Sequence, residues 1–343
     1  MAKLGDYVKI RTGKLDANAS SESGQYPFFT CAIEPLKIDS YSYDCECVLV
    51  AGNGDLNVKY YSGKFDAYQR TYIIESMDKT FLDVQYLYFF MDKYLETLRS
   101  QSIGGVIKYI KLGNLTEADI FIPSIERQRK IVQILRKSRK LISLRKQQLA
   151  KLDELVKARF VEMFGDPVSN PKHWKTAFLL DIGYCKNGMN FHKGDSGVDI
   201  HCLGVGDFKN RTMIQNVEDL PFVSLNELPD PEYLLRDNDI IFVRSNGNKE
   251  LVGRCLAIYP GSIPVTYSGF CIRYRLTSTN IDTPYLLQVL KTDSIRKKMT
   301  GRGANIQNLN QQTLSQLLVP IPPLSLQNEF AAFVERVDYT AEP

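Results

Sequence analysis

The sequence lacks the marks of membrane, secreted and metal-binding proteins. No segment approaches the roughly 18 consecutive apolar residues of a membrane-spanning helix, and the first residues, MAKLGDYVKI, contain no signal-peptide core. The seven cysteines are odd in number and scattered, without a Cys-x-x-Cys pair, which argues against a disulfide framework or a zinc site. Only Cys45 with Cys47, and His201 with Cys202, are close together. These absences favour a cytoplasmic protein with reduced thiols.

Charge is unevenly distributed along the chain, although the net charge is only +4. Ten lysines and arginines but no acidic residue lie between Arg127 and Lys151, so the rest of the chain is net acidic. The remaining composition, with 44% hydrophobic and 24% charged residues, is typical of a folded protein. A length of 343 residues suffices for two domains, each with its own core.

An internal repeat determines the predicted architecture. IFIPSIERQ at 120–128 corresponds to VPIPPLSLQ at 319–327 with a shift of 199 residues, and the same shift aligns GGVIKYI at 104–110 with GANIQNL at 303–309. VLVAGNG at 48–54 and IFVRSNG at 241–247 correspond after a small gap. Single residues also pair at this shift: Asp83 with Asp282, Tyr86 with Tyr285 and Tyr68 with Tyr267.

Each copy of the repeat predicts an α+β unit. Short apolar strands such as Val48–Ala51 and Ile240–Val243 come first, bounded by Gly and Asn turns. An amphipathic helix follows, capped by Asp83 in the first copy and by Asp282 in the second. A Gly-containing loop, a strand ending in Pro and a second helix complete the unit.

A long helix is predicted between the two copies, from Ile125 after the capping Ser124 to Phe164 before a Gly-Asp-Pro turn. As an α-helix it would extend about 58 Å. A stripe with 3-4 spacing predicts a coiled-coil seam with polar interruptions, which needs a partner helix. The stripe consists of Leu135, Ser138, Ile142, Arg145, Leu149, Leu152, Val156, Arg159 and Met163.

The duplicated junction resembles that of type I restriction–modification specificity subunits. A strand ending in Ile-Pro, then Gln and an apolar residue opening a long helix, occurs at Ile122 to Ile131 and at Ile321 to Phe330, with the glutamines at 128 and 327. The Gly-x-x-Ile segments (Gly104/Ile107, Gly303/Ile306) and MFGDP…PKHW at 163–174 are also similar to that family. The resemblance covers nearly the whole chain.

This resemblance implies a non-catalytic subunit in which each half, a target-recognition domain, reads one part of a bipartite double-stranded DNA sequence. The long helices would set the separation and dock two methyltransferase subunits and, when present, the restriction subunit. No cofactor is expected in this chain, because S-adenosylmethionine would be held by the methyltransferase partner. The expected segments are residues 1–124 and 167–323 as recognition domains, 125–166 as spacer helix, and 324–343 as the start of a second one.

The second spacer helix departs from the family pattern. The sequence stops at Pro343, and only Phe330, Phe333, Val334 and Val337 start the second stripe. A full coiled coil within the chain is therefore not expected. Self-association, or dependence on a partner subunit, is expected instead.

Candidate DNA contacts are loops rich in Arg, Lys, Asn and Gln, because these side chains read base edges and bind phosphates. One such loop follows a strand in each copy, and the alternative for both is a solvated hairpin turn. In the second copy the candidates are Arg244, Ser245, Asn246, Asn248 and Lys249. In the first copy they are Asn53, Asn57, Lys59 and Tyr60.

Other candidates come from turns and Gly-rich loops, whose alternative role is a connection packed on a helix. The Gly-rich loops contribute Lys108 from the first copy, and Arg302 and Gln307 from the second. Turns contribute Gln69, Arg70, Arg11, Lys14, Asn187 and Lys193. The basic run from Arg127 to Lys151 has three interpretations: phosphate contact across the unread spacer, binding to an acidic partner, or a solvated helix face.

Catalytic motifs are absent or incomplete. VLVAGNGD at 48–55 faintly resembles the glycine loop of S-adenosylmethionine enzymes, but the second copy has Arg244-Ser245 there. Asp230-Pro231-Glu232-Tyr233 misses the second Pro of an adenine-methyltransferase motif, and there is no Walker A loop. The specificity subunit is therefore the favoured hypothesis. The alternatives are a scaffold or decoy of the same fold, which binds methyltransferase subunits but not DNA, and an enzyme in its own right.

Overall fold

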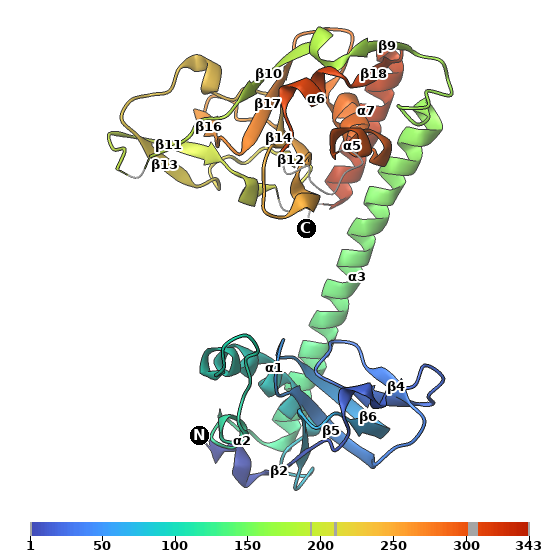
Figure 1. Cartoon of the computed structure of the whole chain (residues 1–343), viewed down its shortest axis with the longest axis vertical. Coiled ribbons are helices and arrows are strands. Elements are labelled where there is room, and N and C mark those ends of the chain that lie inside the picture. Colours follow the sequence, from blue (N-terminus) through green and yellow to red (C-terminus); the bar gives the residue numbers. More distant parts are fainter. Residues whose placement is uncertain (1, 193, 209–210, 301–307, 342–343) are drawn as a thin grey trace. The chain divides into compact units, whose positions relative to one another are not determined.

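The computed structural model describes residues 2–192, 194–208, 211–300 and 308–341. The chain divides into two compact units, Met1–Arg145 and Lys146–Pro343, and the division falls inside the long helix α3 (Ile125–Phe164) (Figure 1). Each unit combines strands with helices, as the α+β prediction required. No helix among the described residues is both long and apolar enough to cross a membrane.

The first unit is built on a six-stranded sheet in the order β2-β7-β5-β6-β3-β4. All neighbours are antiparallel except the parallel pair β3–β6. A separate antiparallel pair joins β1 (Ala2–Lys3) to β8 (Asp119–Ile120). The sheet strands are β2 (Val8–Thr12), β3 (Tyr26–Phe29), β4 (Leu36–Ile38), β5 (Tyr43–Ala51), β6 (Val58–Ala67) and β7 (Thr71–Ser76).

Helix α1 (Val84–Gln101) forms the main core of the first unit together with β5 and β7. It begins at the predicted Asp83, whose carboxylate accepts hydrogen bonds from the backbone N–H groups of Gln85 and Tyr86. Its buried residues recur at helical spacing and pack with Val48, Val50 and Ile74 of the sheet. A short helix, α2 (Leu112–Thr116), follows before β8.

The second unit contains a five-stranded sheet, β10-β17-β14-β15-β12, and a three-stranded sheet, β13-β11-β16. A further antiparallel pair joins β18 to β9. The strands are β9 (Lys175–Phe178), β10 (Gly183–Asn187), β11 (Val198–Leu203), β12 (Met213–Ile214), β13 (Phe222–Leu225), β14 (Asp239–Val243), β15 (Cys255–Ile258), β16 (Val265–Tyr267), β17 (Cys271–Leu276) and β18 (Leu318–Ile321). The helices are α4 (Thr283–Lys291), α5 (Asp293–Thr300), α6 (Gln311–Ser315) and α7 (Leu324–Ala341).

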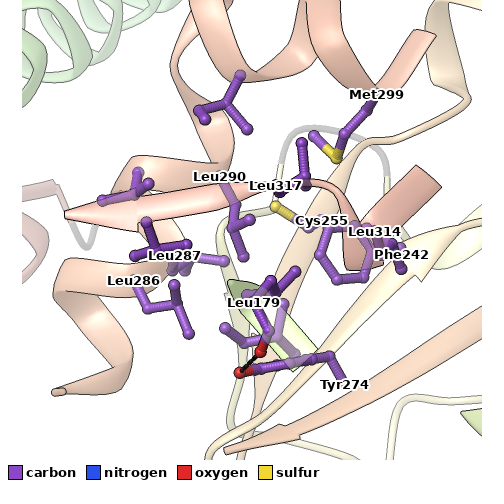
Figure 2. Close-up of a cluster of buried hydrophobic side chains, with 14 of the residues drawn as sticks. Leu179, Phe242, Cys255, Tyr274, Leu286, Leu287, Leu290, Met299, Leu314 and Leu317 are labelled. Carbon is purple, nitrogen blue, oxygen red and sulfur yellow. Dashed lines mark hydrogen bonds between the residues drawn. The ribbon is translucent and has the colours of Figure 1, made fainter. Parts of the chain in front are cut away.

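The core of the second unit gathers leucines from α4 and α6 against the large sheet. Figure 2 shows Leu286, Leu287 and Leu290 beside Phe242, Cys255 and Tyr274 of the strands. The Tyr274 hydroxyl donates a 2.9 Å hydrogen bond to the carbonyl oxygen of Leu179, so this buried phenol is satisfied. Burial raises the pKa of the Cys255 thiol to about 11, which keeps it protonated and unreactive at neutral pH.

The two units share one topology. The order β2-β7-β5 in the first matches β10-β17-β14 in the second, and the outlying pair β1–β8 matches β9–β18. The long strand β6 of the first unit corresponds to two strands, β15 and β16, in the second, which explains why one sheet becomes two. The duplication inferred from the sequence is thus present in the fold.

The predicted register is wrong by one residue near the strands. Tyr68 donates its backbone N–H to Phe29 and corresponds to Ser268, which donates to Leu203; Tyr267 is not its counterpart. Likewise Gly52 corresponds to Arg244, since their N–H groups bond to the carbonyl oxygens of Arg70 and Phe270. Asn53 therefore matches Ser245. The second copy is offset by 192 residues at Gly52 and by 200 at Tyr68, instead of the predicted 193 and 199. A shift of one residue exchanges the two faces of a strand.

A buried glutamine fixes the same junction in both units. Gln128 Nε2 donates to the carbonyl oxygens of Phe81 (2.7 Å) and Pro123 (2.8 Å), and its Oε1 accepts from the N–H of Asp83 at 2.9 Å. Gln327 makes the equivalent bonds to Asn280, Pro322 and Asp282 at 3.0, 2.8 and 2.8 Å. Both glutamines are fully buried. The Ile-Pro…Gln motif therefore joins the start of α3 to the N-cap of α1, and the start of α7 to the N-cap of α4.

Helix α3 has the predicted bounds and contains 40 residues, or about 60 Å of helix. Its predicted seam is not uniform. Leu135, Ile142 and Leu149 are 37%, 57% and 38% exposed, whereas Val156 and Met163 pack against the core of the second unit. The first part of the seam, from Leu135 to Leu149 in the middle of α3, is therefore open to a partner. At its end, Arg159 binds Glu329 of α7 at 2.9 Å, and Phe160 contacts Phe330 with ring centroids 5.5 Å apart.

Candidate DNA-recognition surfaces

Five loops of the first unit meet at one end of its sheet, and we call them the first loop surface. They comprise residues 13–16, 30–34, 52–57, 68–70 and 103–110, and the surface also includes Lys59, which lies at the start of β6 and donates to Asn57. Backbone hydrogen bonds connect them: Gln69 N–H to Leu15 (2.9 Å), Gly52 N–H to Arg70 (2.7 Å) and Gly54 N–H to Lys108 (2.9 Å). Because these loops are held to one another, the backbone positions that carry the candidate side chains are fixed relative to one another.

Cys31 and the predicted Asn53 and Asn57 form the centre of the first loop surface. The Cys31 thiol donates to Asn53 Oδ1 at 2.8 Å, and Asn57 Nδ2 donates to the Cys31 carbonyl oxygen at 2.8 Å. The Lys59 ammonium also donates to Asn57 Oδ1. Burial lowers the pKa of Lys59, so its ammonium is less well solvated than that of an exposed lysine.

The exposed cations of the first loop surface surround this centre. Lys14, Arg70 and Lys108 are all exposed, and Gln69 is held by a 2.8 Å bond from its Nε2 to Asp16. The structure thus brings together seven of the nine residues predicted in the first copy. They are Lys14, Asn53, Asn57, Lys59, Gln69, Arg70 and Lys108.

Arg11 and Tyr60, the other two predictions, have partners elsewhere. The Arg11 guanidinium forms an ion pair with Glu75 and lies over the Tyr43 ring, 5.1 Å from its centroid. The Tyr60 hydroxyl donates to Glu46 at 2.8 Å and accepts from Gln85 of α1 at 3.4 Å. Both side chains stabilise contacts within the unit.

The corresponding surface of the second unit, the second loop surface, contains residues 187–189, 244–248, 268–270 and 308–309. Arg244 donates its backbone N–H to Phe270 (2.8 Å) and accepts from Leu309 (2.8 Å), while Arg244 Nη1 donates to Gly269 (3.4 Å). Asn187 Oδ1 accepts a 3.4 Å bond from Gln311. A small open depression lies between the loops, lined by Val205, Ser245, Asn246, Gly247 and Phe270.

Two predicted asparagines of the second loop surface organise its backbone. Asn246 Oδ1 accepts from Asn248 N–H at 2.8 Å, and Asn248 Oδ1 caps the next short helix by accepting from Glu250 N–H at 3.0 Å. Lys249 is the first residue of that helix. Lys193, Arg302 and Gln307, predicted with them, lie outside the described residues.

Each unit has one arginine in this hydrogen-bonded pair of loops, but the arginine lies on a different loop in the two units. In the first unit Gly52 faces Arg70; in the second Arg244 faces Phe270. A Cβ at Gly52 would lie only 2.4 Å from the Arg70 carbonyl oxygen, so the first unit cannot carry an arginine at 52 without moving its backbone. The guanidinium therefore comes from Arg70, in the turn before β7, in the first unit. In the second unit it comes from Arg244, directly after β14.

Sequence reasoning did not find Cys31 or Phe270. Cys31 lies in the loop between β3 and β4, which contains no cluster of polar residues, and the Asn57 bond to it links residues 26 positions apart. Phe270 is 61% exposed beside Arg244. Phe270 occupies the position of the candidate Arg70, and this match could have indicated it. The predicted alignment, which is one residue out of register, hides the match.

The basic segment of α3 is divided between contacts and exposed cations. Arg136 Nη1 donates to Gln85 at 3.0 Å, and Arg139 Nη1 donates to the Tyr88 hydroxyl at 2.6 Å and also pairs with Asp92 of α1. Lys137 and Lys140 are exposed. The two arginines thus fix α1 to α3, and the lysines are accessible to a charged partner.

The sequence matches the model of the type I restriction modification DNA specificity domain over residues 1–154 and again over residues 171–342. The chain belongs to this family. It is a DNA-recognition subunit of a type I restriction–modification system, with two specificity domains, and not the catalytic subunit. The resemblance seen in the Ile-Pro…Gln motifs is confirmed.

Relatives support this assignment along most of their length. The chain is 26% identical to the EcoDI specificity subunit of Escherichia coli, covering 98% of this chain and 80% of that protein. It is 21% identical to the MjaVIII specificity subunit of Methanocaldococcus jannaschii, covering 100% and 86%.

Solved structures share the fold. The specificity subunit of M. genitalium superimposes with a TM-score of 0.59 at 17% identity, over 99% of this chain and 89% of that one. A second structure, described in connection with complex assembly of the type I system, has a TM-score of 0.52 at 13% identity and coverage of 99% and 90%. The predicted α+β class with two similar domains is confirmed.

Proposed function

We propose that each loop surface reads one half of a bipartite double-stranded DNA target. The observation that carries this proposal is the duplicated loop pair, in which each specificity domain presents one arginine beside asparagine or serine side chains. A guanidinium can bind the O6 and N7 atoms of guanine, and a carboxamide the N6 and N7 atoms of adenine. The recognition domains we propose are residues 1–124 and 167–323.

The other residues of the first loop surface would position the protein. Lys14, Lys59 and Lys108 supply charge for phosphates, which fixes the register of a domain on the duplex without reading its sequence. In the second domain, Lys249 would do the same. This division of roles predicts that lysine variants weaken all DNA binding, whereas arginine variants change the choice of sequence.

The middle of α3 is our proposed docking site for partner subunits. Leu135, Ile142 and Leu149 expose apolar side chains at heptad-like spacing, which a second helix would cover. We propose that two methyltransferase subunits bind there, that they hold the S-adenosylmethionine, and that a restriction subunit joins the complex. Self-association of the chain through the same seam is the alternative way to cover it.

Binding measurements distinguish recognition from the scaffold or decoy hypothesis. Fluorescence anisotropy would be recorded with the chain alone and with its methyltransferase subunits, on a duplex carrying the target motif that methylome sequencing of the host identifies. We expect binding at least about a thousandfold tighter than to a random duplex, the lower range for specific DNA-binding proteins. Equal affinity for both duplexes, with methyltransferase binding retained, would establish the scaffold.

Neutralising Lys137 and Lys140 should weaken DNA binding without changing its specificity. Each lysine that contacts a phosphate releases a counterion, so Lys137→Gln with Lys140→Gln should lower the slope of log affinity against log salt by about one unit per contact. The measurement is a salt titration on target and random duplexes. An unchanged slope would assign these lysines to a protein partner or to solvent.

Specific DNA should protect Cys31 from alkylation. Because Cys31 bonds to Asn53, a duplex bound there would cover its thiol, and with DNA at about ten times Kd the reaction should slow about tenfold. Mass spectrometry after N-ethylmaleimide treatment gives the rate for each cysteine. Cys45, near the opposite end of β5, is the matched control and should react at the same rate with and without DNA. Equal rates for Cys31 would place the first loop surface outside the interface.

A further inference from the structure

A small hairpin of the first loop surface exposes two large apolar side chains at its tip. Val106 and Ile107 are 104% and 62% exposed. The hairpin is closed by two bonds between Ile103 and Tyr109, from N–H to carbonyl oxygen at 3.0 and 2.8 Å. Side chains of this kind are usually buried, and two adjacent ones at a projecting tip indicate a site of contact.

The backbone holds this tip in place. Gly104 adopts φ +115°, and a Cβ there would lie 2.5 Å from the carbonyl oxygen of Ile107. Glycine is therefore required for the turn. Gly105, in contrast, has open space around it and no positive φ. The tip therefore has a defined conformation, which a substitution at Gly104 should change and one at Gly105 should not.

The hairpin is continuous with the residues proposed to read DNA. Tyr109 bridges to Asn53, Lys108 accepts the N–H of Gly54, and Ile110 donates to Gly52. Exposed Lys108 directly follows the tip, and exposed Arg70 is connected to the hairpin through Gly52, which donates to the Arg70 carbonyl oxygen and accepts from Ile110. An apolar tip with cations on the same surface fits a partner that is polyanionic outside and apolar inside, and stacked base pairs between phosphate strands have that chemistry.

We infer that Val106 and Ile107 form a wedge that enters a base-pair step of the half-site read by the first domain. Apolar side chains of this kind open a stacked step and bend the duplex, at a cost that depends on the sequence of the step. The wedge would select flexible steps that no polar side chain contacts. This inference rests on the proposed function, since it assumes that the first loop surface binds DNA.

The test uses the full chain with its methyltransferase subunits and duplexes carrying the methylated motif. 2-Aminopurine, whose fluorescence rises when it is unstacked, replaces one base at a time across the first half-site. We expect a rise at one step with the native chain and no rise there with the Val106→Ser, Ile107→Ser variant. The variant should bind the target about tenfold more weakly, the equivalent of about 1.4 kcal/mol of lost apolar burial. Its affinity for random duplex and its salt slope should not change.

Matched variants and substrates separate the outcomes. Gly104→Ala should behave like the double variant, whereas Gly105→Ala should bind like the native chain. A signal that persists in the double variant comes from base extrusion by the methyltransferase and overturns the wedge. The wedge is also overturned if the double variant no longer binds more weakly than the native chain once deoxyuridine replaces thymidine in the duplex. That result would assign Val106 and Ile107 to contact with a thymine methyl group. If the variant fails only to bind the methyltransferase, the tip is a protein contact. If the native chain shows no preference for its target, the proposed function itself fails.

Discussion

Replacing Gln128 by alanine should lower the free energy of unfolding of the first domain by about 3–5 kcal/mol, a large effect for one polar residue. The substitution removes the bonds of the partly buried Asp83 N–H and of the Phe81 and Pro123 carbonyl oxygens. It also creates a cavity where a fully buried side chain stood. Since Asp83 caps α1, the loss should spread to the helix that covers the sheet.

Hydrogen exchange measured by mass spectrometry reports this loss domain by domain. Gln128→Ala should reduce protection of β5 and leave β14 unchanged, and Gln327→Ala should do the reverse, because the same contacts are duplicated. Gln133→Ala, exposed on the same helix, is the control and should change stability by less than about 0.5 kcal/mol. Equal effects of Gln128→Ala and Gln133→Ala would remove the buried glutamine from its structural role.

Arg244→Ala should relax sequence choice in one half of the target and leave the other half unchanged. A bidentate guanidinium contact to guanine contributes about 1–3 kcal/mol of discrimination, or about 5- to 150-fold in relative affinity. Arg244 is half-buried, and its Nη1 donates a hydrogen bond to the carbonyl oxygen of Gly269. Its side chain is therefore already oriented before DNA binds. Competition between target duplexes with single base changes measures the effect.

Arg70→Ala is the reciprocal experiment in the first domain. It should relax the other half-site, because Arg70 and Arg244 stand on opposite sides of the same loop pair. Arg11→Ala is the control for loss of an arginine from the same domain; its ion pair with Glu75 predicts altered stability and unaltered sequence choice. Loss of affinity for every duplex alike, from either Arg70→Ala or Arg244→Ala, would make that arginine a phosphate contact.

The helices could be predicted because their caps and periodicity are local signals, and the repeat because its motifs recur in the same order along the chain. Asp83 caps α1, α3 begins at Ile125, and the Ile-Pro…Gln motif recurs at a constant shift. Periodicity also predicted the seam of α3. It could not show that Val156 and Met163 are covered by their own unit, since that depends on tertiary packing.

The candidate surfaces were harder to predict because they depend on which loops converge. Seven residues of the first copy do meet, although they come from four separate segments of the chain. Arg11 is also a basic residue in a candidate turn, but it pairs with Glu75 on the neighbouring strand, 64 positions away in the sequence. Cys31 gave no signal at all. A one-residue gap error concealed the match of Gly52 with Arg244, because a strand register cannot be read from composition.

Methylome sequencing of a host that carries this chain and its methyltransferase subunits tests the central claim most directly. Two similar domains that each read DNA predict one gapped motif, with two short specified halves separated by unspecified bases. Exchanging residues 167–323 for the second domain of a relative should replace one half and preserve the other. A continuous motif, or a motif whose two halves both change on that exchange, would contradict the account.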